Sequence, residues 1–207
     1  MTLPAHLNAG STRYSTVAII LHWMIAFGIL VLIAMGLIMD HLHLDPMRVF
    51  QLYQLHKSIG ITVLLLVIIR IGWRLLHRAP PLPDTMPVTE KKLAHLAHLA
   101  LYVLQIILPL SGWAMVSVSV FAIPTVLFSV VPWPDLPVLP TLENKAPVED
   151  ALKTVHHWLA WGLLALITAH VAAALRHRFI LHDSVLAQML PSLKKSVPLS
   201  RRKDHTS

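Results

Sequence analysis

Four long runs of apolar residues dominate the chain. They lie at about residues 17–39, 56–76, 93–122 and 154–179. A membrane-spanning helix needs about 20 mainly apolar residues, and the bilayer core holds no water that could hydrogen-bond an open backbone. The pattern therefore predicts an all-α fold, an integral membrane four-helix bundle that forms a single membrane domain over residues 1–207.

Two segments depart from this pattern. Residues 123–147 contain six prolines and begin with an apolar stretch. The segment is too rich in proline for a spanning helix and too apolar for an ordinary loop, so we expect it to lie on the outer membrane face or to fold over the bundle. Residues 192–207 are expected to form a disordered cytoplasmic tail.

The charged residues predict how the bundle is oriented. The chain is 56% hydrophobic and 13% charged, with a formal net charge of +7. Most basic residues lie beside apolar runs and are not interleaved with aromatic residues, which argues against nucleic acid as a partner. Of the 17 Lys and Arg residues, only four lie on the side opposite the termini: Arg48, Lys57, Lys145 and Lys153. The positive-inside rule therefore places both termini in the cytoplasm.

Histidine is the residue type that points to chemistry. The chain has no cysteine, which excludes iron–sulfur clusters and covalently attached c-type haem, but it has 14 histidines beside 10 acidic residues. Histidine within an apolar span is costly and tends to be functional, and neutral imidazole is the usual axial ligand of haem iron. Four histidines lie within the predicted spans at positions that can face each other in pairs: His22, His56, His156 and His170.

Their spacing and depth arrange these histidines in pairs. His156 and His170 are 14 residues apart, which leaves them about 40° short of four full turns and about 21 Å apart along one helix face. His157 points away from that face. By depth, His22 matches His170 towards the cytoplasm and His56 matches His156 towards the outside. The pattern predicts two bis-histidine haems, one towards each membrane face.

Other roles for intramembrane histidines stay open. A single histidine in a span can be a hydrogen-bonded packing residue, a proton relay or a quinone contact. A transporter or channel that uses histidines as a proton or metal relay is therefore an alternative, and it predicts no haem absorption. Four histidines whose depths match in pairs favour haem.

Further residues are candidates for contacts with a cofactor. His98 can be a ligand of the inner haem, a contact to a quinone or a haem propionate, or an interfacial histidine. Arg70 follows His56 by 14 residues, and it can pair with the inner propionates or extend to the cytoplasmic surface. Lys57 and Ser58 are candidates for the outer propionates. No residue is assigned a catalytic role.

The sequence resembles the bacterial cytochrome b561 family of di-haem four-helix membrane proteins, which is related to the cytochrome b subunits of nickel–iron hydrogenases. The resemblance covers most of residues 13–191. Four stretches carry it: RYSTVAIILHWMIAFGIL, LHKSIGITVLLLVIIRIGWRLLHRAPP, LAHLAHLALYVLQIILPLSGW and VHHWLAWGLLALITAHVAAALRHRFILHDSVLAQMLP.

This resemblance implies a function in electron transfer. It implies two haem b groups with His22, His56, His156 and His170 as axial ligands, ubiquinone as the redox partner and residence in the bacterial inner membrane. One branch of the family is similar to a superoxide oxidase, which makes superoxide a candidate electron donor, although residues 123–147 do not align with that branch. The alternative is a haem-bearing anchor subunit that exchanges electrons with a hydrogenase or dehydrogenase as its partner protein.

Overall fold

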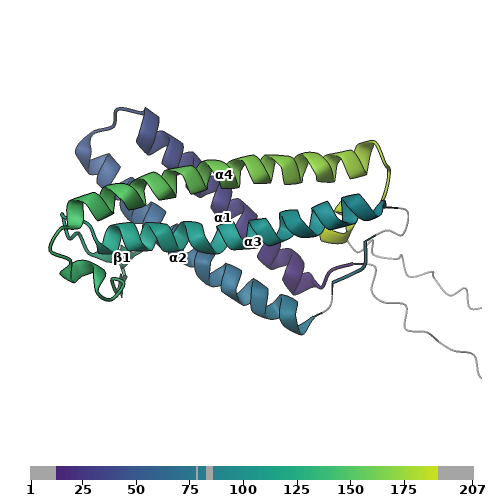
Figure 1. The fold of residues 1–207 in the computed structure, drawn as a ribbon, viewed down its shortest axis with the longest axis horizontal. Helices are drawn as coiled ribbons and strands as arrows, with labels where there is room; N and C mark the ends of the chain where they lie inside the picture. Colours follow the sequence, from purple (N-terminus) through teal and green to yellow (C-terminus); the bar gives the residue numbers. More distant parts are fainter. Residues whose placement is uncertain (1–12, 78, 83–85, 191–207) are drawn as a thin grey trace, which may run out of the picture.

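The computed structural model describes residues 13–77, 79–82 and 86–190. Four helices make up most of this part of the chain: α1 (Thr16–His41), α2 (Pro46–Leu76), α3 (Val88–Ser117) and α4 (Lys145–Phe179) (Figure 1). Each of the four is long and apolar enough to cross a membrane. The predicted all-helical fold with four candidate spans is therefore confirmed.

The bundle has two distinct ends. Both ends of the described chain and the α2–α3 connection lie together at one end, which we call the terminal end (Figure 1). The α1–α2 turn and the segment that joins α3 to α4 lie at the other, which we call the hairpin end. Neighbouring helices pack in chain order, with α1 on α2, α2 on α3 and α3 on α4.

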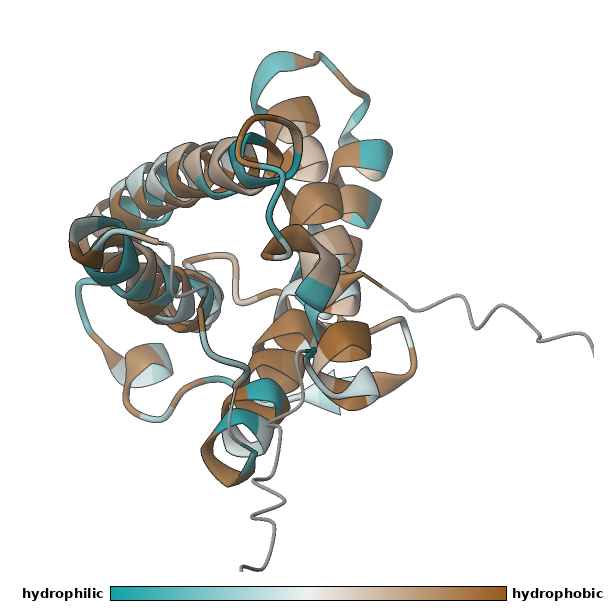
Figure 2. Cartoon of the chain, turned by 90° about the vertical axis from the view of Figure 1, so that its right-hand side faces the viewer, coloured by the Kyte–Doolittle hydropathy of each residue, from teal (hydrophilic) through white to brown (hydrophobic). Residues whose placement is uncertain are grey.

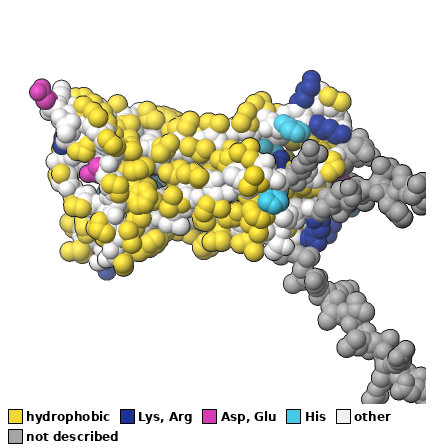
Figure 3. All heavy atoms as spheres, turned by 90° about the horizontal axis from the view of Figure 1, so that it is seen from below, with side chains coloured by type: hydrophobic (Ala, Val, Ile, Leu, Met, Phe, Trp, Pro, Cys, Tyr) yellow, Lys and Arg dark blue, Asp and Glu magenta, His cyan; other side chains and the backbone are white. Residues whose placement is uncertain are grey.

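The buried core of the bundle is small, and most apolar side chains face outwards. Ile25, Val67 and Leu163 are almost fully buried and come from α1, α2 and α4. Many large hydrophobic residues are exposed, among them Phe27, Ile68 and Trp158, and hydrophobic residues recur along all four helices (Figure 2). A side view shows an apolar band between the two ends, with Lys and Arg gathered at the terminal end (Figure 3). Such a surface suits lipid rather than water.

The helices do not begin and end where the apolar runs do. Helix α2 begins at Pro46 and α4 at Lys145, about three turns before the expected spans, and α3 ends at Ser117 rather than near residue 122. At the start of α2 a cap, rather than hydropathy, sets the limit. The Asp45 side chain accepts a hydrogen bond from the Arg48 amide (3.1 Å), and proline stands at the first position of α2.

The proline-rich connection forms a small β-hairpin. Strand β1 (Thr125–Leu127) pairs antiparallel with β2 (Val131–Trp133), and a short 3₁₀ helix, η1 (Leu139–Thr141), follows. Strand β1 packs against α2. Strands were not predicted here from the sequence, because the frequent prolines obscure the short runs of β-forming residues between them.

Two serines on the spanning helices anchor this hairpin. The Phe128 amide donates to Ser58 Oγ of α2 (2.9 Å), and the Leu136 amide donates to Ser117 Oγ of α3 (2.9 Å). Both serine side chains are buried and also donate to a carbonyl one helical turn earlier. Hydrogen bonds therefore fix this segment to both α2 and α3.

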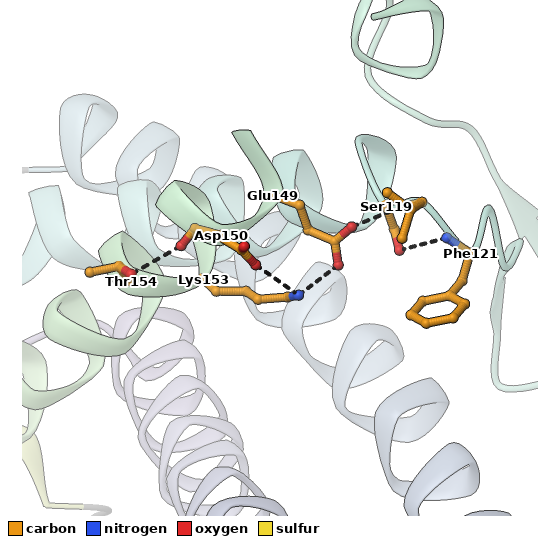
Figure 4. Close-up of polar contacts among 7 residues, drawn as sticks. Ser119, Phe121, Glu149, Asp150, Lys153 and Thr154 are labelled. Atoms are coloured by element: carbon orange, nitrogen blue, oxygen red, sulfur yellow. Dashed lines mark hydrogen bonds and ion pairs between the residues drawn. The ribbon is translucent and has the colours of Figure 1, made fainter. Parts of the chain in front are cut away.

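A buried carboxylate ties the same segment to α4 (Figure 4). Glu149 is 5% exposed, and its carboxylate accepts from the Val120 amide (2.8 Å) and pairs with Lys153 Nζ (2.8 Å). A buried carboxylate is stable only when such partners replace water. The polar contact in Figure 4 thus fixes where the chain leaves α3 and where α4 begins.

At the terminal end the two ends of the described chain meet. The short 3₁₀ helix η2 (Leu186–Met189) packs against α4. Trp23 Nε1 of α1 donates to the Met189 carbonyl (2.9 Å), and the Arg13 guanidinium donates to the Leu190 carbonyl. The tail predicted for residues 192–207 lies outside the described residues.

Candidate functional site

The four intramembrane histidines form two pairs that both involve α4. His22 of α1 and His170 of α4 face each other towards the terminal end, with ring centres 6.4 Å apart and ring planes at 71°. His56 of α2 and His156 of α4 do the same towards the hairpin end, at 6.4 Å and 68°. We call these the terminal-end pair and the hairpin-end pair.

The ring spacing suits two ligands on opposite sides of one metal ion. An imidazole nitrogen binds a metal at about 2 Å, and the ring centre lies about 1 Å further out, so two opposed imidazoles have centres about 6 Å apart. Both pairs have this separation, although they lie on different helices and at different depths. The arrangement therefore suits two separate bis-histidine sites.

A cavity of about 340 Å³ opens at the hairpin-end pair, and both His56 and His156 line it. Pockets for cofactors measure about 300–1,000 Å³. Three glycines contribute to its wall: Gly36, Gly60 and Gly112. A Cβ atom at Gly36 or Gly60 would meet no atom within 4 Å, whereas at Gly112 it would lie 3.0 Å from His156 Cε1. The first two glycines leave room in the cavity, and the third leaves room for the histidine ring.

A serine on α3 determines which nitrogen of His156 carries the proton. Ser111 Oγ donates its proton to the Leu108 carbonyl (2.7 Å) and lies 2.9 Å from His156 Nδ1. Because a serine has a single proton, Ser111 Oγ must accept from Nδ1–H of His156. Nε2 of the neutral ring then keeps its lone pair, which is the state that binds a metal.

Ser111 was not among the residues predicted from the sequence. Its role depends on how α3 packs against α4, and no local motif marks it. The partner histidine differs in this respect, since Nδ1 of His56 is buried without a hydrogen-bond partner.

The terminal-end pair lies beside the other two candidate residues. Arg70 Nη1 lies 2.8 Å from His22 Nδ1, and its guanidinium lies 5.6 Å from the centre of the Tyr102 ring. Since arginine is always protonated, it donates, and the proton of neutral His22 is therefore on Nε2. The ring of His98 is 5.5 Å from that of His170. A cavity of about 40 Å³ nearby is lined by Arg70 and Tyr102 but not by these histidines.

Comparison with known proteins identifies the family. A family model described as prokaryotic cytochrome b561 matches residues 13–192. The chain belongs to the prokaryotic cytochrome b561 family. Among its relatives in Escherichia coli (strain K12), cytochrome b561 homolog 2 is 34% identical over 179 residues (86% of this chain and 91% of the relative), and cytochrome b561 homolog 1 is 29% identical over 182 residues (88% and 99%). A Yersinia pestis protein named probable superoxide oxidase CybB is 31% identical over 183 residues (86% and 96%).

Membership of the cytochrome b561 family confirms the resemblance seen in the sequence. It implies haem b binding and a role in electron transport, and it agrees with a multi-pass membrane protein. The residues of the hairpin end fit haem b. The cavity has a suitable size, His56 and His156 both line it with ring centres 6.4 Å apart, and Ser111 holds the proton of His156 on Nδ1, which leaves Nε2 able to bind a metal.

Proposed function

We propose that this cytochrome b561 binds two haem b groups and transfers electrons across the bacterial inner membrane to or from quinone. The observation that carries the proposal is the equal ring spacing of 6.4 Å in two histidine pairs at opposite ends of one bundle. His56 and His156 would hold one haem, and His22 and His170 the other. When bound, haem supplies an iron atom that gains and loses one electron at a time.

Helix α4 sets the distance between the two sites. Its two ligands are 14 residues apart, or about 21 Å along the helix. Electrons can therefore cross the apolar part of the bundle in two stages, one site lying towards each face. The protein contributes ligands, apolar surroundings and hydrogen bonds that orient the ligands and tune the reduction potentials, and no side chain acts as a nucleophile.

At the terminal end, His22 Nδ1 and the haem propionates would compete for the Arg70 guanidinium. In the structure its guanidinium donates to His22 Nδ1. Ligation through Nε2 of His22 requires Nδ1 to carry the proton instead, so Arg70 must release it. We expect the freed guanidinium to pair with the haem propionates, and His98, which lies beside His170, to contact a propionate or the quinone.

The charge distribution supports a cytoplasmic terminal end. Figure 3 shows Lys and Arg gathered there. By the positive-inside rule, both termini face the cytoplasm and the hairpin end faces outwards. On this orientation the hairpin-end site is the outer one.

Superoxide is the electron donor with a specific observation in its favour. The Yersinia pestis relative is named as a probable superoxide oxidase. In this chain Lys57 lines the hairpin-end cavity and would attract an anion, whereas Lys153, which also lines it, is paired with Glu149 and Asp150. Stopped-flow mixing of the purified protein with superoxide should then reduce the haems and, in turn, ubiquinone. No reduction, together with co-purification of a hydrogenase or dehydrogenase, would favour the anchor-subunit alternative.

A reduced-minus-oxidised visible spectrum with a count of haem per chain tests the central proposal. We expect two haems in the wild-type protein, one in His156→Ala and one in His170→Ala, with His157→Ala as a control that keeps both. A spectrum without a Soret band would support a histidine-based transporter instead. Retention of two haems by either of the first two variants would refute the assignment of ligands.

A further inference from the structure

The β-hairpin presents two unused hydrogen-bonding groups to the hairpin-end cavity. Thr125 Oγ1 and Trp133 Nε1 are both buried without a partner, and both residues line the cavity. The Thr125 residue is 5% exposed. Buried donors without partners are costly and uncommon in native proteins. Their position therefore indicates a bound group with acceptor atoms.

The register of the hairpin places these two groups side by side. Thr125 and Trp133 are direct partners across the two strands. Residues opposite each other in an antiparallel pair project from the same face. The indole of Trp133 also lies 5.5 Å from that of Trp113, whose Nε1 donates to the Pro134 carbonyl (2.9 Å). The hairpin thus presents its two donors from a fixed position.

The chemistry of this face selects an anionic acceptor. Indole Nε1–H can only donate, and a hydroxyl can donate when an acceptor is present. Lys57 adds a positive charge to the lining of the same cavity. Hydrogen bonds from such donors are strongest when the acceptor is ionised, as a carboxylate is.

We propose that Trp133 and Thr125 donate hydrogen bonds to the carboxylates of the haem held by the hairpin-end pair. This inference rests on the proposed function and adds to it a role for the proline-rich segment. The hairpin is then part of the cofactor site, and its anchors on Ser58, Ser117 and Glu149 hold the two donors in place.

The test measures the release of haem from Trp133→Phe and Thr125→Val to an excess of apomyoglobin in detergent. The phase of haem release that is lost in His156→Ala is the one that belongs to the hairpin-end haem. We expect this phase to be about ten-fold faster in both variants, as is typical when outer-shell partners are lost. The midpoint potential of the same haem should fall, because carboxylates without donors place more negative charge near the iron.

A matched control separates hydrogen bonding from packing. Trp161 lines the same cavity, but its Nε1 already donates to His157 Nε2 (3.2 Å). Trp161→Phe should therefore release haem at the wild-type rate. With haem dimethyl ester, which has no free carboxylate, Trp133→Phe should behave like the wild type.

Three outcomes would overturn the inference. The first is wild-type release and potential in both hairpin variants, and the second is an equal acceleration in Trp161→Phe. The third is a Trp133→Phe effect that persists with the ester. If Trp133→Phe does not fold, Thr125→Val carries the test alone. A wild-type protein without haem would refute the proposed function itself, and this inference with it.

Discussion

Replacement of Ser111 by alanine tests how the protein prepares His156 to bind iron. The Ser111 residue is 8% exposed, and its Oγ accepts from His156 Nδ1–H while donating to the Leu108 carbonyl. Alanine removes the acceptor and leaves a buried N–H group without a partner. The ring then loses both its fixed orientation and its preference for the tautomer with a free Nε2.

The size of the effect follows from the cost of the lost hydrogen bond. Leaving a buried donor unsatisfied costs about 1–3 kcal/mol. Since about 1.4 kcal/mol corresponds to a ten-fold change in a dissociation constant, we expect haem to bind the hairpin-end site about 5- to 150-fold more weakly. Outer-shell substitutions at metal sites commonly cost about 10- to 100-fold, which agrees with this range.

The assay is a titration of haem-free protein with haemin, followed by its Soret absorption. Two phases are expected in the wild type, and the one that disappears in His156→Ala belongs to the hairpin-end site. Ser111→Ala should weaken that phase alone. Thr62→Val serves as the control, because Thr62 Oγ1 also donates to a carbonyl one turn earlier (2.8 Å) and, within the described part of the chain, does not bond to a histidine. An unchanged haem affinity of the hairpin-end site in Ser111→Ala would refute the role of Ser111 in setting the tautomer of His156.

Three further substitutions probe the two sites and the packing between helices. Gly60→Leu fills the hairpin-end cavity and should reduce the haem content to roughly one per chain. Gly72→Leu, on the exposed side of α2, should keep both haems. The same haem content in the two variants would contradict this. Arg70→Gln should weaken haem binding at the terminal end by about ten-fold in the same titration. A loss of affinity confined to the hairpin-end site would contradict the role of Arg70 at the terminal end. Gly28→Ala puts a Cβ atom 2.7 Å from Val63 Cγ2, so we expect a loss of about 1–3 kcal/mol in stability. A lower thermal unfolding midpoint in detergent would show this loss, and an unchanged midpoint would count against it.

Much of the architecture was readable from the chain itself. A run of about 20 apolar residues can only cross a bilayer as a helix, because the backbone must satisfy its own hydrogen bonds. The regular turn of the α-helix also allowed the relative direction of His156 and His170 to be worked out from their spacing. Both properties belong to one segment at a time and do not depend on the other helices.

The ends of the helices were harder to predict from the sequence. Hydropathy placed His56 at the start of its span, but α2 begins at Pro46, so His56 lies well inside the helix. A helix continues past the apolar region as long as its polar residues favour it and a cap is available further on. The hairpin could not be predicted for a related reason, since the two serines and the carboxylate that anchor this segment come from three different helices.

The sequence by itself determined the number of spanning helices, their apolar surface and the phase of the two histidines on α4. The tertiary structure decided which groups those histidines meet. Ser111 reaches His156 across 45 residues of sequence, and Arg70 reaches His22 across 48. The cavity and the two donors of the hairpin likewise arise only where separate segments come together. Helix periodicity is a local property of the chain, whereas the rotation and tilt that bring two side chains into contact depend on the packing of the whole bundle.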